Sequence, residues 1–473
     1  MGCLLFRVIV IMQATSPSIL LGASVGGTTY TNSQSTFIFG ASGAFAGGPN
    51  QVTGQWREFS LPETSIWFAN GRRASSGDLP PLYEVYAGVQ FGQVIHSTRI
   101  EFGWDWTSLD LRAWQAETFS ADAHLTLPQA LDAIVEEPTS VIFENLIKHL
   151  SPDGLRFEVE CDIGAATTHG WSVLPAAADV GDHVWTLKVY SGEEQVDSSH
   201  CIIRVLPAGT GAGIPVRMLM IGDSLTEYSL YPNKVAARCA ARNGLALTLL
   251  GTRHPQAADS LVFHEGYGGW TWYRFLNHFE PQPDPAKGLV SSPFVFPING
   301  QPTFDVRRYY RTACKGEEPD LVTILLGVND CISLDPADPS SVEAVIEQTL
   351  DTAEMMVRSF CQASPKTHVG ICLTLPPNGR ESAFSTNYDG LFTRKRWKPV
   401  QHRLVQKLLA RFDGRDHERI FIVPTGLNVS PQESYPFNNA IHPNDRGYGE
   451  IASSIHRWML ARFYVGRSHL SPR

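Results

Sequence analysis

A serine that could act as a nucleophile, Ser224, directly follows an apolar run that predicts a buried strand. The run, residues 216–221, ends at Gly222 within the segment MLMIGDSLTEYS. Open α/β sheets bind ligands outside the carboxyl ends of their strands, so this turn would place Ser224 beside a bound substrate. A serine between a strand and a helix is, however, most often only a helix N-cap. Nucleophilic chemistry at Ser224 therefore requires a base and hydrogen-bond donors from other parts of the chain.

Other segments of the chain contain these additional parts. His442, in the segment NNAIHPNDRGY, could accept the proton of the serine and later return it. Asn329 emerges from a strongly apolar strand in Gly-Val-Asn-Asp, and Gly269 lies in the glycine-rich segment HEGYGGWTW. The amides of Ser224 and Gly269 and the Asn329 side chain could donate to an oxyanion, at about 3–4 kcal/mol each. Together these residues predict attack of a serine on an ester carbonyl.

Each of these residues also has a structural interpretation that the sequence leaves open. Ser224 could cap a helix, Asn329 could form a turn, and His442 could be a hydrogen-bonded structural histidine. Gly269 could serve only a tight turn.

Neighbouring residues are expected to support the site rather than to react. His264 and Glu265 would hold the glycine-rich segment by hydrogen bonds, and Asp223 would stabilise its turn or the helix that follows. Trp270 and Trp272 would either line the acyl site or pack beneath the loop.

Apolar runs that alternate with helical patterns must position these residues. Strands are predicted at residues 216–221, 245–251, 320–327, 368–375 and 419–424. Helices are predicted at residues 231–243, 342–360 and 447–463. Ser340 and Glu343 are spaced for a capping box at the start of the second helix. The alternation is typical of a parallel, doubly wound α/β sheet.

Two long segments interrupt this alternation, at residues 280–318 and 376–398. Each follows a strand or motif expected at the carboxyl edge of the sheet, and long loops in such a core are usually functional walls or lids. A purely structural insertion is the alternative. The second segment favours a sugar over a lipid because it is polar. Its polar residues include Asn378, Arg380, Asn387, Asp389 and Arg394.

The chain before this sheet is dominated by β-strand patterns. Residues 1–124 are predicted as a β-rich region, and its tryptophan cluster could stack on sugars or belong to a core or an interface. The cluster consists of Trp104, Trp106 and Trp114. Four short runs at residues 125–207 predict a small β-sandwich of the immunoglobulin-like type. Residues 208–214 are expected to link this sandwich to an α/β domain at 215–465.

Composition and charge narrow the classes of protein. The 473 residues carry a formal net charge of −9 at pH 7 and no dense Lys/Arg tract, which disfavours a nucleic-acid partner. No apolar run approaches the length of a membrane span. The short run LLFRVIVIM at residues 4–12 is compatible with a degenerate secretion signal, with a buried strand, or with a start site assigned too early. A secreted or periplasmic location and a cytoplasmic one both stay open, as does the oligomeric state.

The eight cysteines show no spacing typical of a metal site, and no cofactor or metal is expected. Cys361 and Cys372 are expected to be buried free thiols. Cys161 and Cys201 both lie in strand-like runs of the predicted sandwich. A disulfide between them is therefore a hypothesis.

The four segments, in the order serine, glycine, asparagine and histidine, resemble the SGNH or GDSL hydrolases, a family of serine esterases. The resemblance covers residues 215–465 and implies a flavodoxin-like α/β/α sandwich. It implies Ser224 as nucleophile, His442 as base, and Gly269 and Asn329 with the Ser224 amide as oxyanion donors. The form HEGYGGW, behind a β-sandwich, is similar to bacterial members of the family that act as carbohydrate acetylesterases.

The expected function is therefore hydrolysis of short acyl esters, such as acetyl groups on a carbohydrate. The partner would be a small-molecule or polysaccharide ester. One alternative is a lipid or polyester esterase that uses the same residues. The other is a non-catalytic carbohydrate-binding protein on the same scaffold.

One position departs from the pattern of the family. An aspartate usually stands three residues before the histidine, and Asn439 occupies that position here. Another carboxylate could orient His442, with Glu433 as the candidate, because Asp445 is expected to cap the last helix. Alternatively, a backbone carbonyl or the Asn439 side-chain oxygen accepts the proton on Nδ1. We expect this second arrangement, a Ser-His dyad, because an ester needs less help than an amide.

Overall fold

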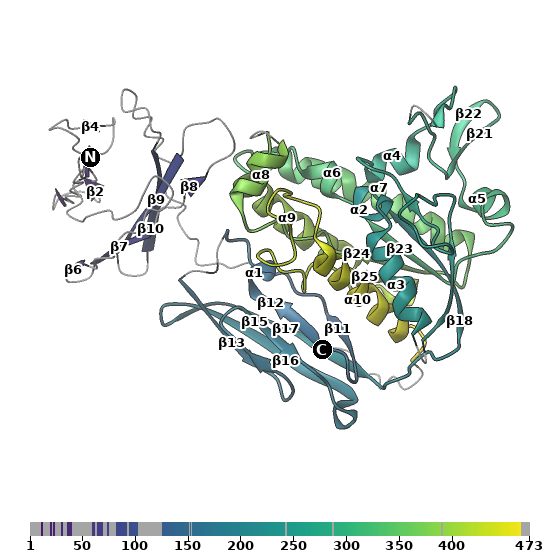
Figure 1. Ribbon diagram of the computed structural model, residues 1–473, viewed down its shortest axis with the longest axis horizontal. Helices are drawn as coiled ribbons and strands as arrows, with labels where there is room; N and C mark the ends of the chain where they lie inside the picture. Colours follow the sequence, from purple (N-terminus) through teal and green to yellow (C-terminus); the bar gives the residue numbers. More distant parts are fainter. Residues whose placement is uncertain are drawn as a thin grey trace. The chain divides into compact units, whose positions relative to one another are not determined.

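The computed structural model describes residues 125–464, apart from residues 151, 153, 242–243, 286–287 and 389–390, and ten short strands between residues 11 and 102. The chain divides into two compact units, Met1–Ser120 and Ala121–Arg473 (Figure 1). Apart from β1, the run at residues 4–12 lies outside the described residues, and so does the tryptophan cluster at 104–114. The domain boundaries proposed from the sequence stay predictions.

The first unit contains short strands, of which β6, β7, β9 and β10 form an antiparallel sheet with β8 at its side. The strands are β1 (Ile11–Met12), β2 (Ile19–Leu20), β3 (Gly22–Ala23), β4 (Tyr30–Thr31), β5 (Thr36–Phe39), β6 (Phe59–Leu61), β7 (Thr64–Ala69), β8 (Arg73–Ala74), β9 (Leu82–Phe91) and β10 (Val94–Phe102).

A parallel sheet in the order β19-β18-β23-β24-β25 organises the second unit. Its strands are β18 (Pro215–Gly222), β19 (Ala246–Leu250), β23 (Leu321–Leu325), β24 (His368–Cys372) and β25 (Ile420–Val423). In chain order this is 2-1-3-4-5, the doubly wound order of flavodoxin-like sheets. The order reverses between β18 and β23, and ligands of such sheets bind at this switch point. The predicted α/β class with a parallel sheet is therefore confirmed.

Side chains of β18 point alternately to two hydrophobic cores, which is why the strand is apolar from Met218 to Ile221. Leu219 and Ile221 pack on one face, and Val216, Met218 and Met220 pack on the other. Helices α4 (Trp272–Asn277), α5 (Val306–Thr312), α7 (Pro339–Ala363) and α9 (Arg394–Phe412) cover the first face. Helices α3 (Leu230–Ala240) and α10 (Asp445–Ala461) cover the second face and pack against each other.

Shorter elements lie in the connections of this sheet. They are α2 (Ser224–Glu227), β20 (Glu265–Gly266), β21 (Val295–Ile298), β22 (Gln301–Phe304), α6 (Val328–Cys331), α8 (Glu381–Tyr388) and the 3-10 turn Asp416–Glu418. None of the described helices has the combination of length and apolar character that crossing a membrane requires.

The start of α7 corrects the predicted capping box. The helix begins at Pro339, and the Asp338 side chain accepts a hydrogen bond from the Ser341 amide at 3.1 Å. Proline suits the first helical position because an N–H there would have no acceptor within the helix, so nothing is lost by its absence. The helix therefore starts at residue 339 rather than at the predicted residue 342. Glu343 instead pairs with Arg403 of α9, at 2.8 Å between Oε2 and a guanidinium nitrogen.

Two small sheets precede the α/β part within the second unit. One has the order β11-β17-β16-β13 and the other β12-β15-β14, and Trp171, Trp185 and Val141 lie buried in their shared core. The elements are β11 (Ala130–Ile134), β12 (Thr139–Ile142), α1 (Phe143–Leu146), β13 (Leu155–Glu160), β14 (Ala165–Ala166), β15 (Gly170–Val173), the 3-10 turn Ala177–Asp179, β16 (Gly181–Ser191) and β17 (Glu194–Leu206). The immunoglobulin-like type stays a prediction.

The proposed Cys161–Cys201 disulfide is wrong, because both thiols are free. Cys201 on β17 is buried in the core of the two sheets, whereas Cys161 follows β13 and only packs against that core. Two strand-like runs in one sequence region do not determine which thiols approach each other.

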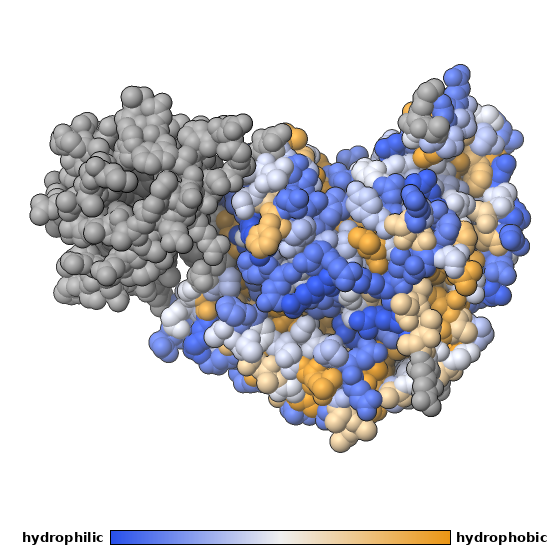
Figure 2. Space-filling view, in the orientation of Figure 1, coloured by the Kyte–Doolittle hydropathy of each residue, from blue (hydrophilic) through white to orange (hydrophobic). Residues whose placement is uncertain are grey.

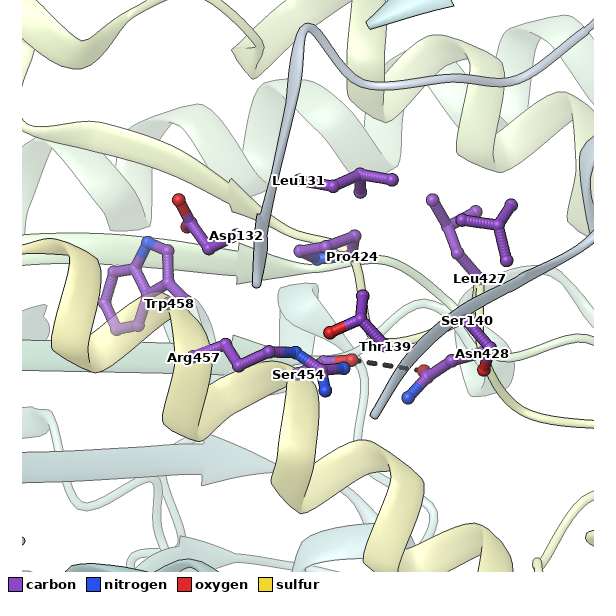
Figure 3. Close-up of a pocket in the computed structure, with 11 residues that line it drawn as sticks. Leu131, Asp132, Thr139, Ser140, Pro424, Leu427, Asn428, Ser454, Arg457 and Trp458 are labelled. Atoms are coloured by element: carbon purple, nitrogen blue, oxygen red, sulfur yellow. Dashed lines mark hydrogen bonds between the residues drawn. The ribbon is translucent and has the colours of Figure 1, made fainter. Parts of the chain in front are cut away.

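Buried polar contacts join these two sheets to the α/β part. The Asn145 side-chain amide donates to the carbonyls of Gly426 and Val429 at 2.9 and 2.8 Å. Buried Lys398 of α9 donates to the Glu144 carbonyl at 2.9 Å. A cavity of about 20 Å³ lies in the same seam, between Leu131 of β11 and Trp458 of α10 (Figure 3). It is large enough for about one water molecule and belongs to the seam rather than to the site described next.

Candidate active site

Ser224 stands at the switch point of the sheet, with its hydroxyl free of any capping role. The turn is tight, because a Cβ on Gly222 would lie 2.1 Å from Thr226 Oγ1 and 2.8 Å from the Leu325 carbonyl. Asp223, not Ser224, caps α2, and its Oδ1 accepts a hydrogen bond from the Leu225 amide at 3.0 Å. The structural interpretation of Ser224 as an N-cap is therefore wrong.

His442 approaches Ser224 from 218 residues further along the chain. Its Nε2 lies 2.8 Å from Ser224 Oγ. Burial lowers the pKa of the His442 ring below its usual value of 6.5, so the neutral ring prevails at neutral pH. Tyr228, one turn after Ser224, packs edge-on against this ring with 5.4 Å between ring centroids.

Asn439 determines which nitrogen of His442 carries the proton. Its Oδ1 accepts hydrogen bonds from the amides of Ile441 and His442 at 3.1 and 2.9 Å, which identifies this atom as the oxygen. The same oxygen lies 3.2 Å from His442 Nδ1, so Nδ1 must be the protonated nitrogen. Nε2 is then an acceptor, and the Ser224 hydroxyl donates to it.

The carboxylates considered as a third member lie elsewhere. Glu433 forms an ion pair with Arg446, and its side chain is 61% exposed. Asp445 pairs with Lys234 at 2.7 Å, and Asn444 rather than Asp445 caps α10. Of the two arrangements drawn from the sequence, the structure shows the one with the Asn439 oxygen at Nδ1.

The glycine-rich segment packs directly on the turn that carries Ser224. A Cβ on Gly266 would lie 2.5 Å from the Glu227 amide nitrogen, and one on Gly268 would lie 3.9 Å from Ser224 Cβ. The Gly268 amide donates to Glu227 Oε2 at 3.1 Å. Gly269 follows with φ of +72°, a conformation that favours glycine. Among the described residues, no hydrogen-bond acceptor is assigned to the amides of Gly269 and Ser224, so both can donate to a ligand.

The Asn329 side chain reaches the switch point but is already hydrogen bonded. Its Nδ2 donates to Asp223 Oδ2 at 3.2 Å and to the Trp270 carbonyl at 3.1 Å. These two acceptors use both hydrogens of the amide. From α6, which follows β23, the side chain therefore links the glycine-rich segment to the Asp223 turn before any substrate binds.

Two carboxyl groups lie buried beneath this arrangement. Asp330 Oδ1 accepts a hydrogen bond from the Trp272 amide at 3.1 Å. Burial raises the pKa of Asp223 to about 7 and that of Asp330 to about 7. Trp270 and Trp272 are themselves buried, so they pack beneath the loop instead of forming an open acyl wall.

The polar segment 376–398 supports the histidine loop, a role that its composition did not reveal. The Asn378 amide donates to the carbonyls of Pro436 and Asn439 at 2.8 and 2.9 Å. Arg394 pairs with Glu144 at 2.7 Å, in the seam with the β-sheets. These side chains form hydrogen bonds and ion pairs within the protein, so the polarity of the segment is not evidence for a sugar substrate. Asp389 lies outside the described residues.

The other long segment, residues 280–318, is anchored in the core. It forms the hairpin β21-β22 and helix α5. Phe294 is fully buried and contacts Phe275, Tyr309 and Phe360, with ring centroids 6.1, 4.6 and 5.3 Å away. This packing favours the structural interpretation of the segment.

Among the described residues, no group of three or more His, Cys, Asp or Glu side chains is arranged to hold a metal ion. The chemistry that the site offers is that of a serine hydroxyl, an imidazole base and backbone N–H donors.

No protein-family model matches the chain, and no curated protein matches its sequence. Among the solved structures, a carbohydrate esterase family 3 protein from Talaromyces cellulolyticus is 15% identical, with 52% of this chain and 98% of that chain covered and a TM-score of 0.31. A protein from Parabacteroides merdae described as a GDSL-like lipase is 14% identical over 54% and 99% of the two chains, with a TM-score of 0.31. A carbohydrate acetylesterase from Sinorhizobium meliloti is 16% identical over 52% and 100%, with a TM-score of 0.31. Because these identities and TM-scores are low, we base the function on the geometry around Ser224.

Proposed function

We propose that this chain is a serine esterase of the SGNH type, with Ser224 as nucleophile and His442 as general base. The observation that carries the proposal is the 2.8 Å contact between Ser224 Oγ and His442 Nε2. Because Asn439 Oδ1 accepts the proton on Nδ1, Nε2 is free to accept the proton of the serine. A nucleophile within hydrogen-bond distance of a base that a third group orients is the arrangement that activates a serine.

The reaction follows from these positions. Ser224 Oγ bonds to the ester carbonyl carbon while His442 Nε2 takes the hydroxyl proton. The oxyanion accepts hydrogen bonds from the amides of Ser224 and Gly269. The bond to the leaving alcohol then breaks, and the alcohol takes the proton from Nε2. Water attacks the acyl-serine in the same way, and the carboxylic acid leaves as Ser224 regains its proton.

Asn329 is the third proposed oxyanion donor, on one condition. Its amide must release the Trp270 carbonyl and turn that hydrogen toward the oxyanion, while the bond to Asp223 holds the side chain in place. Such a donor is strengthened only when negative charge develops, so it would act on the transition state more than on the substrate.

For the substrate we propose short acyl esters, such as acetyl groups on a carbohydrate. The supporting feature is the aromatic surface beside the base. Tyr228 is 47% exposed and packs edge-on against the His442 ring. An aromatic side chain that is exposed to solvent beside the base suits stacking of a sugar ring.

Reaction with a fluorophosphonate and hydrolysis of p-nitrophenyl esters test the proposal. We expect wild-type protein to be labelled at one serine and to cleave the acetate faster than the decanoate, and Ser224→Ala to abolish both with little change in Tm. Faster cleavage of the decanoate would favour a lipid or polyester esterase. A folded wild-type protein that neither reacts nor hydrolyses would favour a non-catalytic binding protein.

The carbohydrate part has its own test. Replacement of Tyr228 by alanine should raise KM for an acetylated oligosaccharide more than KM for p-nitrophenyl acetate, whereas Tyr228→Phe should behave like wild type. Tyr190→Ala, on β16, is the matched control. An equal change on both substrates would show that Tyr228 only supports His442.

A further inference from the structure

His264 lies fully buried behind the site, and both of its ring nitrogens are hydrogen bonded. The Gly266 amide lies 3.0 Å from Nδ1, and Ser229 Oγ lies 2.8 Å from Nε2. A backbone amide can only donate, so Nδ1 is the acceptor. Nε2 then carries the ring proton and donates it to Ser229 Oγ.

The two partners of His264 belong to the two segments that must be aligned for catalysis. Gly266 opens the glycine-rich segment that ends at Gly269, and Ser229 closes the segment that begins at Asp223 and Ser224. Ser229 is buried with φ of +60°, a left-handed conformation that is strained for a residue with a Cβ. Such a conformation persists only where surrounding contacts hold it, and the bond from His264 is such a contact.

We propose that His264 is a positioning residue that fixes the distance between the Gly269 oxyanion donor and the Ser224 nucleophile; this rests on the proposed esterase function. The ring links the two segments through Gly266 and Ser229, and both of its nitrogens are engaged there and not with Ser224 or His442. Burial lowers the pKa of His264 to about 4, so the bridging ring stays neutral throughout the working pH range.

A second link supports the same alignment independently. Glu227 of α2 accepts a hydrogen bond from the Gly268 amide at 3.1 Å and pairs with Arg253 at 3.2 Å. With Gly266 held by His264 and Gly268 held by Glu227, the segment is held at two points directly before the Gly269 amide. Misplacement of a catalytic group by about 1 Å can cost about a hundredfold in rate.

Two substitutions separate the two bonds of His264. The amide nitrogen of His264→Gln can still reach Ser229, whereas His264→Asn is too short and keeps only the bond from Gly266. We expect His264→Asn to lower kcat on p-nitrophenyl acetate about 30-fold with KM within about twofold, and His264→Gln to lower it less than about fivefold. Ser229→Ala keeps the Cβ and should match His264→Asn.

A double-mutant cycle and an active-site count make the test decisive. Ser229→Ala combined with His264→Asn should be no worse than either single variant, because both remove one bond. All rates are expressed per serine labelled by fluorophosphonate. His254→Gln is the control and should leave kcat unchanged, since His254 bonds the Val262 carbonyl in the same loop at 2.9 Å and stacks on Phe263.

The proposal is overturned if kcat per labelled serine is unchanged in His264→Asn, or if the double variant shows the product of the two single losses. It is also overturned if the ¹⁵N shifts of the His264 ring show Nδ1 rather than Nε2 protonated between pH 5 and 8. This last measurement needs no activity. A wild-type protein that is inert to ester and fluorophosphonate would therefore refute the esterase function and still leave the His264 bond tested.

Discussion

Asn439 Oδ1 lies 3.2 Å from His442 Nδ1. The SGNH hydrolases, which this sequence resembles, usually have an aspartate at the position of Asn439. The two backbone amides that bond the same oxygen hold it in place, so the neutral amide orients the imidazole as a carboxylate would. The Asn439 amide lacks the negative charge that would stabilise the imidazolium formed in the proposed attack by Ser224.

We expect Asn439→Asp to raise kcat by up to about tenfold, because the added charge stabilises protonated His442. Asn439→Ala should lower kcat by less than about tenfold, and His442→Ala by about 10³ or more. Steady-state rates on p-nitrophenyl acetate measure all three. Glu433→Gln is the control and should be nearly silent; a loss equal to that of His442→Ala would mean that Glu433 moves to the histidine during catalysis.

The pH profile should follow the depressed pKa of His442. The neutral ring is the active form, so kcat/KM should be flat near neutrality and fall only on acidification below the usual value of 6.5. In Asn439→Asp the same limb should shift to higher pH, since a nearby carboxylate raises the pKa of the ring. An acid limb that does not move between the two proteins would assign it to another group.

Asn329→Ala should lower kcat about a hundredfold with little change in KM, if the amide turns toward the oxyanion. The variant also removes the bonds to Asp223 and Trp270, so thermal unfolding must be measured with it. Thr323→Ala, on the strand β23 that precedes α6, controls for general damage to the core. A change confined to KM would make Asn329 a substrate-binding group.

Asp330 should make the folded state less stable as pH rises. Its pKa is raised from 3.8 to about 7, so the folded state holds a proton that the unfolded state has released. The stability that this proton provides is complete below about pH 4 and is lost as pH rises through about 7, by at most about 4 kcal/mol. Urea unfolding of Asp330→Asn between pH 4 and 8 should show a smaller slope than wild type, with the remainder due to Asp223, whose pKa is also raised to about 7. Asp351→Asn, 71% exposed on α7, should keep the wild-type slope.

Asn145→Ala should destabilise the second unit by about 1–3 kcal/mol, because it leaves the carbonyls of Gly426 and Val429 without their buried donor. A truncated chain that begins near residue 210 lacks both Asn145 and the Glu144 carbonyl that accepts from buried Lys398. We expect this truncated chain to fold poorly. Thr168→Ala, an exposed position near β15, is the control for the single variant. Equal Tm values for Asn145→Ala and wild type would show that the seam contributes little.

Local patterns determined much of this protein from the sequence alone. The five apolar runs became the parallel strands, and the inner strands β23 and β24 are buried on both faces, whereas β19 at the edge has Ala246 and Thr248 exposed. Their ends identified Ser224, Asn329 and the histidine loop as neighbours, because the carboxyl ends of parallel strands share one edge of a sheet. The predicted roles of His264, Glu265 and Asp223 as supports also agree with their hydrogen bonds.

Only the tertiary structure decided the contacts between residues far apart in the chain. The polar composition of residues 376–398 predicted a wall of a sugar-binding site. The Asn378 amide instead donates to the carbonyls of Pro436 and Asn439, 58 and 61 residues away. The free thiols of Cys161 and Cys201 show the same limit. Asn439 was an anomaly in the sequence, and its function depends on which of its atoms faces His442. That orientation is set by two backbone amides in one turn, and hydrogen-bond geometry of this kind exists only once the chain has folded.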